Sequence, residues 1–463
     1  MPKDLQGFLK SLDKSHPERL LKVGAPVDPN LFETTALMEH MARRGIERTA
    51  LFENVKDMRG DDSAFPLLYN LFVTRSHCAL ALGLPADEDR MALTHEISRR
   101  EFVEGETVVV PLVEAPVKEN VLVGDAADMR MLPVGMHHKL DVGPYLTMIC
   151  VMKSPVGGFY DMTFTKNMVK NKQKLSISTH PHHHLDSIIK EYEQMQRRVP
   201  VVIVLGHHPA FSLSTCCITP YGNDDYKTAG AFLGEPLRLT PSTTWGDEFL
   251  VPADAEIIIE GEIPLGVKES QNPFGEILGY YQGEHERPIV EVTAITHRNG
   301  AIMQGIFPGH AEHWVLGGLP KEGSTFNSIK KNVAGVKAVH LPNSGCGRVS
   351  CYISMKKDFE NEPRKAAMQA FIEMPNLKFV VVVDEDVDVY NEREVLWAMT
   401  TRTWWDQDLE VIRKVQDFRD WLGTAVAIVD ATRPKNRPFP LKNDIPQNVL
   451  DRMEFSEILK GLG

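Results

Sequence analysis

The chain has 463 residues, of which 43% are hydrophobic and 25% charged, a composition that predicts a globular protein of two or three domains. Its formal net charge of -12, without a basic patch, argues against a protein that binds nucleic acid. The sequence has no run of about 18 apolar residues, and its first residues lack the apolar stretch of a signal peptide. We therefore expect a cytoplasmic protein without a membrane span, whose six cysteines stay reduced.

Residues 1–120 have the pattern of an α/β domain. Amphipathic periodicity predicts helices, and short apolar runs predict buried strands. Proline-containing turns indicate a boundary near the end of this segment. The predicted elements are helices at 5–12, 31–43 and 87–100 and strands at 49–52 and 66–72.

Residues 121–300 change character, because short β runs separated by Gly/Pro turns dominate. Many short strands of this kind favour a barrel or split barrel. The predicted strands are 145–152, 159–164, 175–178, 199–205, 256–262 and 289–297, with one helix at 185–197.

Residues 301–463 return to an α/β pattern. The predicted strands are 337–341, 348–355, 379–384 and 425–430, and the predicted helices are 362–372 and 392–400. The Pro- and Lys-rich tail at 434–446 is expected to be irregular. The fold class is therefore mixed α/β, with a β-barrel between two α/β regions.

Several ordered motifs resemble those of the UbiD family of decarboxylases. They are Leu51-Phe52-Glu53-Asn54-Val55-Lys56, Val251-Pro252-Ala253-Asp254-Ala255-Glu256-Ile257, Pro273-Phe274-Gly275-Glu276, and Asp384 to Asp388 followed by Trp397 and Thr401-Arg402. The resemblance covers nearly the whole chain. It implies three domains: an N-terminal α/β region, a central split β-barrel that binds a flavin, and a C-terminal domain used to form a homo-oligomer, a dimer or hexamer.

The resemblance also implies a set of cofactors and partners. The family's cofactor is prenylated FMN, supplied by a flavin prenyltransferase and bound through its phosphate by a divalent metal, usually Mn²⁺ but also Mg²⁺ or Fe²⁺, beside a K⁺ ion. Such a cofactor fits the chemistry, because loss of CO₂ from an sp² carbon leaves a carbanion for which no side chain is an adequate electron sink. The protein must then supply positioning and a proton donor for a small aromatic acid substrate.

Glu276 matches the family's proton-donating glutamate. Taken alone, a loop glutamate is more often a solvated surface carboxylate. The surrounding Pro-Phe-Gly motif favours the catalytic interpretation.

Two positions depart from the family pattern. Where the family has an arginine paired with a second glutamate, this chain has Lys166 and Gln271. A lysine lacks the planar fork that grips a carboxylate, so Lys166 would contact the substrate as a point charge. The alternatives are a solvated lysine, a two-residue shift of the motif that makes Glu269 the second glutamate, and a shifted alignment around Lys166 that puts the arginine position on Tyr160 or Asp161.

The resemblance places metal ligands at Asp161, His182 and Asp225. Both aspartates are hard oxygen ligands that suit manganese or magnesium. The histidine belongs to the cluster at 180–184, and the shifted alignment would favour His184 over His182. The cluster alone suggests a zinc metallohydrolase, but adjacent histidines on one turn cannot all converge on a tetrahedral ion.

The remaining candidate residues also follow from the resemblance. Residues expected at the flavin are Thr163, Phe164, Thr165 and Lys166, and the K⁺-binding turn is expected at Ser214, Thr215 and Cys217. The family's phosphate-binding lysine is replaced by Val426, and Arg433 or Lys435 is a candidate to compensate.

His313 lies where relatives acting on hydroxylated arenes can have a functional histidine, although a structural histidine is an equal alternative. The predicted function is the reversible decarboxylation of an aromatic or heteroaromatic acid, phenolic or CoA-linked acids included. The alternative is a non-catalytic subunit of a larger complex, because Lys166, Gln271 and Val426 all depart from the pattern.

Overall fold

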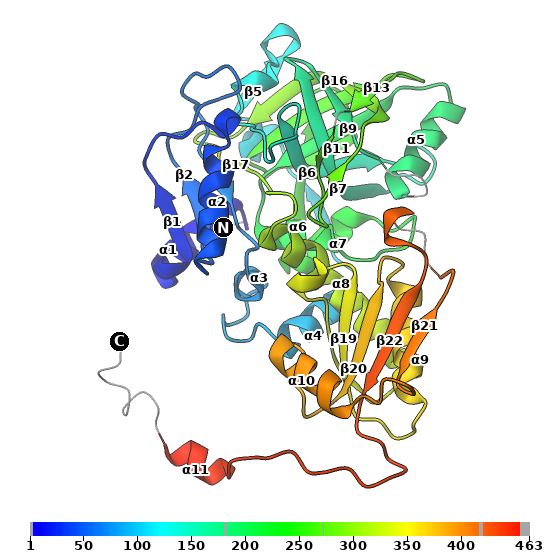
Figure 1. The fold of residues 1–463 in the computed structure, drawn as a ribbon. Helices are drawn as coiled ribbons and strands as arrows, with labels where there is room; N and C mark the ends of the chain where they lie inside the picture. Colours follow the sequence, from blue (N-terminus) through cyan, green and yellow to red (C-terminus); the bar gives the residue numbers. More distant parts are fainter. Residues whose placement is uncertain (1–2, 180–182, 272, 416–419, 454–463) are drawn as a thin grey trace.

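The computed structural model describes residues 3–179, 183–271, 273–415 and 420–453 (Figure 1). The N-terminal part consists of helices around a small sheet with the order β1-β2-β3-β17. The last strand, β17 (Met303–Gln304), comes from far along the chain and pairs in parallel with β3. The other elements of this part are α1 (Leu5–Ser15), β1 (Leu20–Val23), α2 (Glu33–Arg43), β2 (Thr49–Phe52), β3 (Leu67–Tyr69), α3 (Arg75–Ala81) and α4 (Met91–Arg100).

The central part is a closed six-stranded β-barrel. Its strands pair in the ring β12-β9-β6-β7-β8-β16, and β16 pairs again with β12. The ring strands are β6 (Tyr145–Lys153), β7 (Tyr160–Asn171), β8 (Lys174–Ile177), β9 (Val199–Leu205), β12 (Ile257–Ile263) and β16 (His285–His297). The predicted mixed α/β fold with a central barrel is confirmed.

Shorter elements surround the barrel. Strands β5 (Asn120–Val123) and β13 (Lys268–Gln271) add to β16, and β14 (Phe274–Gly275) forms a small hairpin with β15 (Tyr281–Gln282). The remaining elements are β4 (Thr107–Val109), β10 (Leu237–Ser242), β11 (Gly246–Pro252), α5 (His184–Gln194), α6 (Pro209–Ser214) and α7 (Asp225–Leu233).

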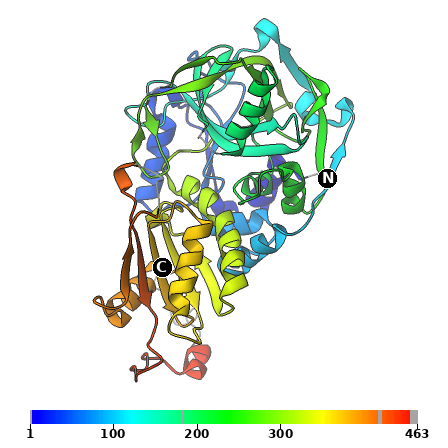
Figure 2. The same cartoon turned by 90° about the vertical axis from the view of Figure 1, so that its right-hand side faces the viewer.

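The C-terminal part is a five-stranded sheet with the order β18-β19-β20-β22-β21. Helices α8 and α9 cover one face, where they lie side by side (Figure 2), and α10 covers the other. The elements are α8 (Ala311–Asn332), β18 (Val336–His340), β19 (Ser350–Met355), α9 (Glu362–Glu373), β20 (Phe379–Asp384), α10 (Glu392–Arg402), β21 (Leu409–Ile412) and β22 (Val426–Ala431). As predicted, the tail at 434–446 is irregular; it leads to α11 (Gln447–Arg452) (Figure 1).

The longest helix of the described residues, α8, was not predicted from the sequence. Its interior contains Pro320 and three glycines, which interrupt a helical pattern. The glycines are needed for close packing: a Cβ at Gly317 would lie 2.5 Å from the guanidinium of Arg348, and one at Gly323 would lie 2.8 Å from Ile97 of α4. Tertiary packing therefore outweighs local propensity along α8.

The predicted strand at 66–72 is shorter than expected, because β3 ends at Tyr69. The next residue, Asn70, has a left-handed backbone with φ 61°, which ends the extended conformation. Within the described residues, no helix is both long and apolar enough to cross a bilayer.

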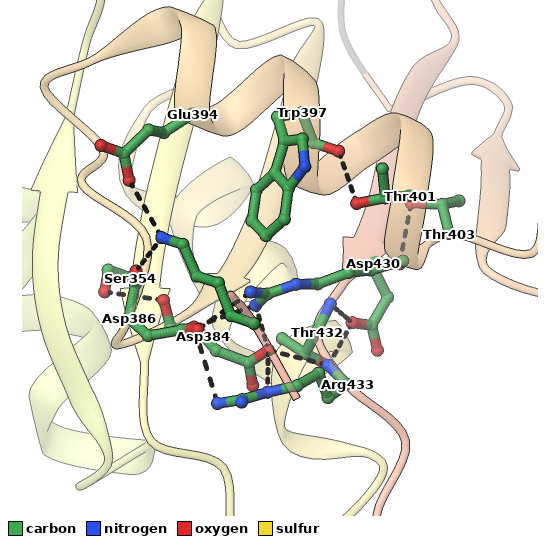
Figure 3. Close-up of polar contacts among 12 residues, drawn as sticks. Ser354, Asp384, Asp386, Glu394, Trp397, Thr401, Thr403, Asp430, Thr432 and Arg433 are labelled. Carbon is green, nitrogen blue, oxygen red and sulfur yellow. Dashed lines mark hydrogen bonds and ion pairs between the residues drawn. The ribbon is translucent and has the colours of Figure 1, made fainter. Parts of the chain in front are cut away.

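Within the motif that runs from residue 384 to 402, Asp384 and Asp386 take part in an ion-pair network of the C-terminal part (Figure 3). Arg402, only 2% exposed, pairs with Asp384 at 2.6 Å and with Asp386 at 2.9 Å. The guanidinium of Arg433 lies 3.3 Å from Asp384. This network joins α10, β20 and the segment after β22, so we interpret the motif as structural.

Candidate active site

Glu276 lies in the tight turn between β14 and β15. Its backbone N–H donates to the carbonyl of Tyr280 at 2.9 Å, and its carbonyl accepts the N–H of Gly279 at 3.0 Å. The residue is only 7% exposed, so it is not a solvated loop carboxylate. The hairpin therefore fixes this side chain in a protein interior.

Lys166 of β7 reaches the same place from the barrel. Its Nζ lies 3.2 Å from Oε1 of Glu276 and 5.6 Å from the centre of the Phe274 ring. The Lys166 side chain is 15% exposed, whereas that of Lys172 is 40% exposed and pairs with Asp125. Lys166 is thus more shielded than Lys172, and about as shielded as Lys170, whose side chain is 17% exposed.

Gln271, at the end of β13, contacts the backbone of Lys166. Its Nε2 donates to the backbone carbonyl of Lys166 at 3.1 Å, and the residue is 1% exposed. Glu269 instead pairs with Lys174 at 2.8 Å. Of the two, it is Gln271 that contacts Lys166.

His313, in the first turn of α8, faces the same charges. Burial is the main cause that lowers the pKa of His313 well below its ordinary value, and the positive charges of Lys166 and Arg348 add to this effect. Glu276 acts in the opposite direction. His313 is therefore a neutral imidazole at pH 7, and its Nδ1 accepts the N–H of Gly309 at 3.2 Å.

Two cations in this region were missed by sequence reasoning. Arg348, which precedes β19, donates to the carbonyls of Gly317 and Gly347, and burial lowers its pKa. Lys321 of α8 donates to the carbonyl of Cys216 at 2.6 Å, and burial, followed by the charge of Arg348, lowers its pKa to about 8. Among the described residues, neither forms an ion pair with a carboxylate.

The turn after α6 is where the K⁺ site was expected. Ser214 and Thr215 both donate their hydroxyls to the carbonyl of Phe211, at 2.8 and 3.1 Å, and the carbonyl of Ser214 accepts the N–H of Cys217 at 3.2 Å. The ammonium of Lys321 already contacts this turn through Cys216. A positive charge therefore lies beside the expected cation-binding carbonyls.

Asp161 and Asp225 lie close together, at 2% and 6% exposure. Burial, and next the negative charge of Asp161, raises the pKa of Asp225 to about 7. Nδ1 of His184 lies 2.8 Å from Asp161, and this hydrogen bond raises the pKa of His184. The predicted ligand His182 lies outside the described residues.

The three residues Thr163, Phe164 and Thr165 follow Asp161 on β7. Neighbouring side chains of a strand point to opposite faces, so the two threonines share a face with Asp161 while Phe164 shares one with Lys166. The Thr163 hydroxyl donates to Asp161 at 3.1 Å. One barrel strand therefore connects the acidic pair with the Lys166–Glu276 pair.

Three sequence models of one family match this chain. They describe the 3-octaprenyl-4-hydroxybenzoate carboxy-lyase N-terminal domain, at residues 13–97, its Rift-related domain, at 109–311, and its C-terminal domain, at 314–419. The chain belongs to the UbiD family. The predicted enzyme class, a carboxy-lyase of this family, is thereby confirmed.

Relatives in the UbiD family match over most of their length. The anhydromevalonate phosphate decarboxylase of Methanosarcina mazei is 30% identical over 414 residues, 89% of this chain and 90% of that one. The UbiD-class enzyme HmfF from Pelotomaculum thermopropionicum, in complex with prFMN, superposes with a TM-score of 0.88 at 32% identity, covering 98% of this chain and 100% of that one. The 3,4-dihydroxybenzoic acid decarboxylase AroY of Klebsiella pneumoniae has a TM-score of 0.85 at 26% identity, with 98% and 100% coverage.

The residues present fit a UbiD cofactor in part. The buried carboxylates Asp161 and Asp225 suit a divalent cation, which would remove the repulsion by which the charge of Asp161 raises the pKa of Asp225. In the described part of the chain, no three His, Cys, Asp or Glu side chains are arranged to bind a metal by themselves. A metal held by two carboxylates therefore needs further oxygen ligands, such as those of a phosphate.

Val426, which the resemblance aligns with a phosphate-binding lysine, lies at 1% exposure in the C-terminal core. The two candidates to compensate have other partners, since Arg433 pairs with Asp384 and Lys435 lies 3.8 Å from Asp358. Lys321, rather than Arg433 or Lys435, contacts the turn from Ser214 to Cys217.

Proposed function

We propose that this protein catalyses the reversible decarboxylation of an aromatic or heteroaromatic carboxylic acid with prenylated FMN, with Glu276 as the proton donor and Lys166 as the contact to the substrate carboxylate. The observation that carries the proposal is the largely buried Lys166–Glu276 pair, a fixed positive charge beside a fixed acid. The overall change is loss of CO₂ from the carboxylate and addition of one proton to the same carbon. Carboxylation is the reverse of these steps.

Prenylated FMN, when bound, would supply the electron sink for the carbanion that loss of CO₂ leaves. The protein's own residues then orient the carboxylate and deliver a proton. Lys166 attracts the carboxylate as a point charge, and Gln271 fixes the β7 backbone at Lys166. Glu276, held by its turn, takes up a proton from solvent and donates it to the carbon from which CO₂ has left, which returns Glu276 to its carboxylate form.

The flavin phosphate would lie toward the acidic pair and the Ser214 turn. We assign the Mn²⁺ ligands to Asp161, Asp225 and a histidine of 182–184, with Mg²⁺ or Fe²⁺ as replacements. We assign K⁺ to the Ser214, Thr215 and Cys217 turn, and flavin contacts to Thr163, Phe164 and Thr165. Lys321 is the cation of this chain that replaces the family lysine missing at Val426.

We propose Arg348 and His313 as the partners of a second polar or anionic group on the substrate. Arg348 acts electrostatically on both Glu276 and His313, but no carboxylate of the described residues neutralises it at contact distance. Two of the relatives act on acids that also bear a phosphate or two hydroxyl groups, by their names. Neutral His313 and cationic Arg348 suit such groups as hydrogen-bond partners.

Cofactor loading is the experiment that tests the proposal. The protein is produced together with a flavin prenyltransferase and purified, and its absorption spectrum, cofactor mass and metal content are measured. Flavin, divalent metal and CO₂ release from a panel of aromatic, phenolic and phosphate-bearing acids are expected, with release lost in Glu276→Gln. A protein without flavin and metal under these conditions would instead be the non-catalytic subunit.

We further propose a cytoplasmic homo-oligomer. All six cysteines are free in the structure, as a reducing compartment requires. The C-terminal part exposes three tryptophans at 45% or more, Trp404, Trp405 and Trp421, and exposed aromatic residues are enriched at protein interfaces. Light scattering should give a mass of at least two chains of 52.0 kDa each, and the mass of a single chain would refute the oligomer.

A further inference from the structure

The hairpin that carries Glu276 contacts a loop of the barrel domain at residues 137–141. Oδ1 of Asp141 accepts the backbone N–H of Gly275 at 3.1 Å. The other oxygen, Oδ2, accepts the backbone N–H groups of His137 and His138 at 3.0 and 2.9 Å. One carboxylate, 7% exposed, therefore joins the loop to the residue before Glu276.

The His138 ring packs directly against Gly275. A Cβ built on Gly275 would lie 2.2 Å from Nδ1 and 2.4 Å from Cε1 of this ring, far inside van der Waals contact. Only glycine leaves room for the imidazole against the backbone at this point. The glycine of the Pro-Phe-Gly-Glu motif is thus explained by His138 rather than by an unusual φ.

A second contact supports the far side of the hairpin. The hydroxyl of Tyr281 accepts the backbone N–H of Leu140 at 3.2 Å. The hairpin is therefore attached to the 137–141 loop on both strands, at Gly275 and at Tyr281. Displacement of the turn needs the loss of the hydrogen bond from Gly275 to a buried charge, which is stronger than a bond between neutral groups, and of the neutral bond at Tyr281.

We infer that Asp141 is a positioning residue for Glu276: it fixes the Glu276 turn through Gly275 while His138 packs on the same glycine, so that the acid stays at the distance from which it can protonate the substrate carbon. The inference rests on the proposed function of Glu276 and names residues that act through it. Asp141 and His138 do not themselves contact the reacting atoms in this assignment. Their effect falls on kcat, because the substrate carboxylate is bound from the other side by Lys166.

Asp141→Asn is the first test variant. Its amide can present oxygen to His137 and His138, but its NH₂ group then faces the N–H of Gly275, and the turn is released. We expect kcat to fall about 10- to 100-fold while KM changes less than about threefold, since a small misplacement of a catalytic group has effects of this size. Asp128→Asn is the matched control, because Asp128 also accepts a backbone N–H, that of Arg130 at 3.0 Å, but away from this hairpin.

Hydrogen exchange gives a readout that does not need activity. The amides of 273–282 should exchange faster in Asp141→Asn than in the wild type and in Asp128→Asn. Unchanged exchange would overturn the inference, and so would faster exchange with an unchanged kcat in an active protein. A wild type that decarboxylates nothing would instead overturn the proposed function, while the exchange data still decide whether Asp141 fixes the turn.

A double variant tests whether the His138 ring is the reason why residue 275 must be glycine. Gly275→Ala places a methyl group against His138 and should lower kcat about 10- to 100-fold. Adding His138→Ala removes the ring, and the double variant should recover at least about fivefold in kcat over Gly275→Ala. If the double variant is no more active than Gly275→Ala, His138 is not what sets the need for glycine.

Discussion

Nζ of Lys166 lies 3.2 Å from Oε1 of Glu276, although the two residues are 110 positions apart in the chain. The barrel supplies one partner and the β14–β15 hairpin the other. Both side chains are largely shielded from solvent, so water and salt weaken the attraction between them less than at an exposed pair. A substrate carboxylate that enters the site must therefore share Lys166 with Glu276.

Replacement of Lys166 should weaken substrate binding. Lys166→Met removes a charged hydrogen bond, and we expect KM to rise about 10- to 100-fold, in line with about 1.5–3 kcal/mol for such a bond. Lys174→Met is the control, since Lys174 pairs with Glu269 at a more exposed site. Steady-state kinetics with the loaded enzyme measure both; an unchanged KM would refute the carboxylate contact.

The pair Lys166 and Gln271 should set substrate range together. The double variant Lys166→Arg/Gln271→Glu introduces the bidentate arginine and its acidic partner, and we expect the order of kcat/KM values over a panel of acids to change. Each single variant serves as a control for the pair. An identical order of substrates in the double variant would show that these departures do not govern preference.

Arg348→Met should reduce discrimination between substrates. Without this charge, KM for acids that bear a second anionic group should rise about tenfold or more, while KM for acids with a single carboxylate changes little. Arg348→Lys keeps the charge and is the control for packing against Gly317. Equal losses for both kinds of acid would mean that Arg348 only supports the fold.

Asp225→Asn should lower metal and flavin content together. It removes one of the two buried carboxylates, so the purified protein should contain less divalent metal per chain by elemental analysis and less flavin by absorbance. Asp224→Asn is the neighbouring control, since Asp224 caps α7 by accepting the N–H of Tyr226 at 3.0 Å. Wild-type metal content in Asp225→Asn would remove this residue from the metal site.

Glu312 should make stability depend on pH. Burial raises its pKa to about 8, so the folded protein keeps a proton that the unfolded chain releases above about pH 4.5. This contribution to stability is therefore present at low pH and lost as pH rises toward about 8. The thermal midpoint of the wild type should fall, relative to Glu312→Gln, between about pH 5 and pH 8; parallel curves would contradict the shift.

The sequence predicts β elements well where the apolar run has clear ends. The strands at 199–205 and 379–384 match β9 and β20, because turn residues or charges flank a continuous Val/Ile run in both. Helix α8 is not predicted in this way, because Gly317, Pro320 and Gly323 interrupt the helical pattern. The two glycines stand where other segments of the chain pack closely against the helix. Such contacts are decided by distant parts of the chain.

Only those residues of the candidate site that lie at motif positions could be predicted from the sequence. Glu276 and Lys166 follow from matched positions, and the structure brings them together. Arg348 and Lys321 could not be found this way, because an arginine in a Gly-rich loop and a lysine on an irregular helix have no local signature of burial. That neither has a carboxylate partner among the residues described by the structure becomes visible only when the fold is known.

The parallel pairing of β17 with β3 has a consequence for how the chain reaches its native state. The N-terminal sheet lacks its edge strand until residues 303–304 have left the ribosome, by which time the whole barrel has been synthesised. Contacts of such long sequence separation form late and slowly. The first part of the sequence therefore cannot complete its sheet before the barrel has been synthesised, and a fragment cut after it would expose an unpaired strand edge.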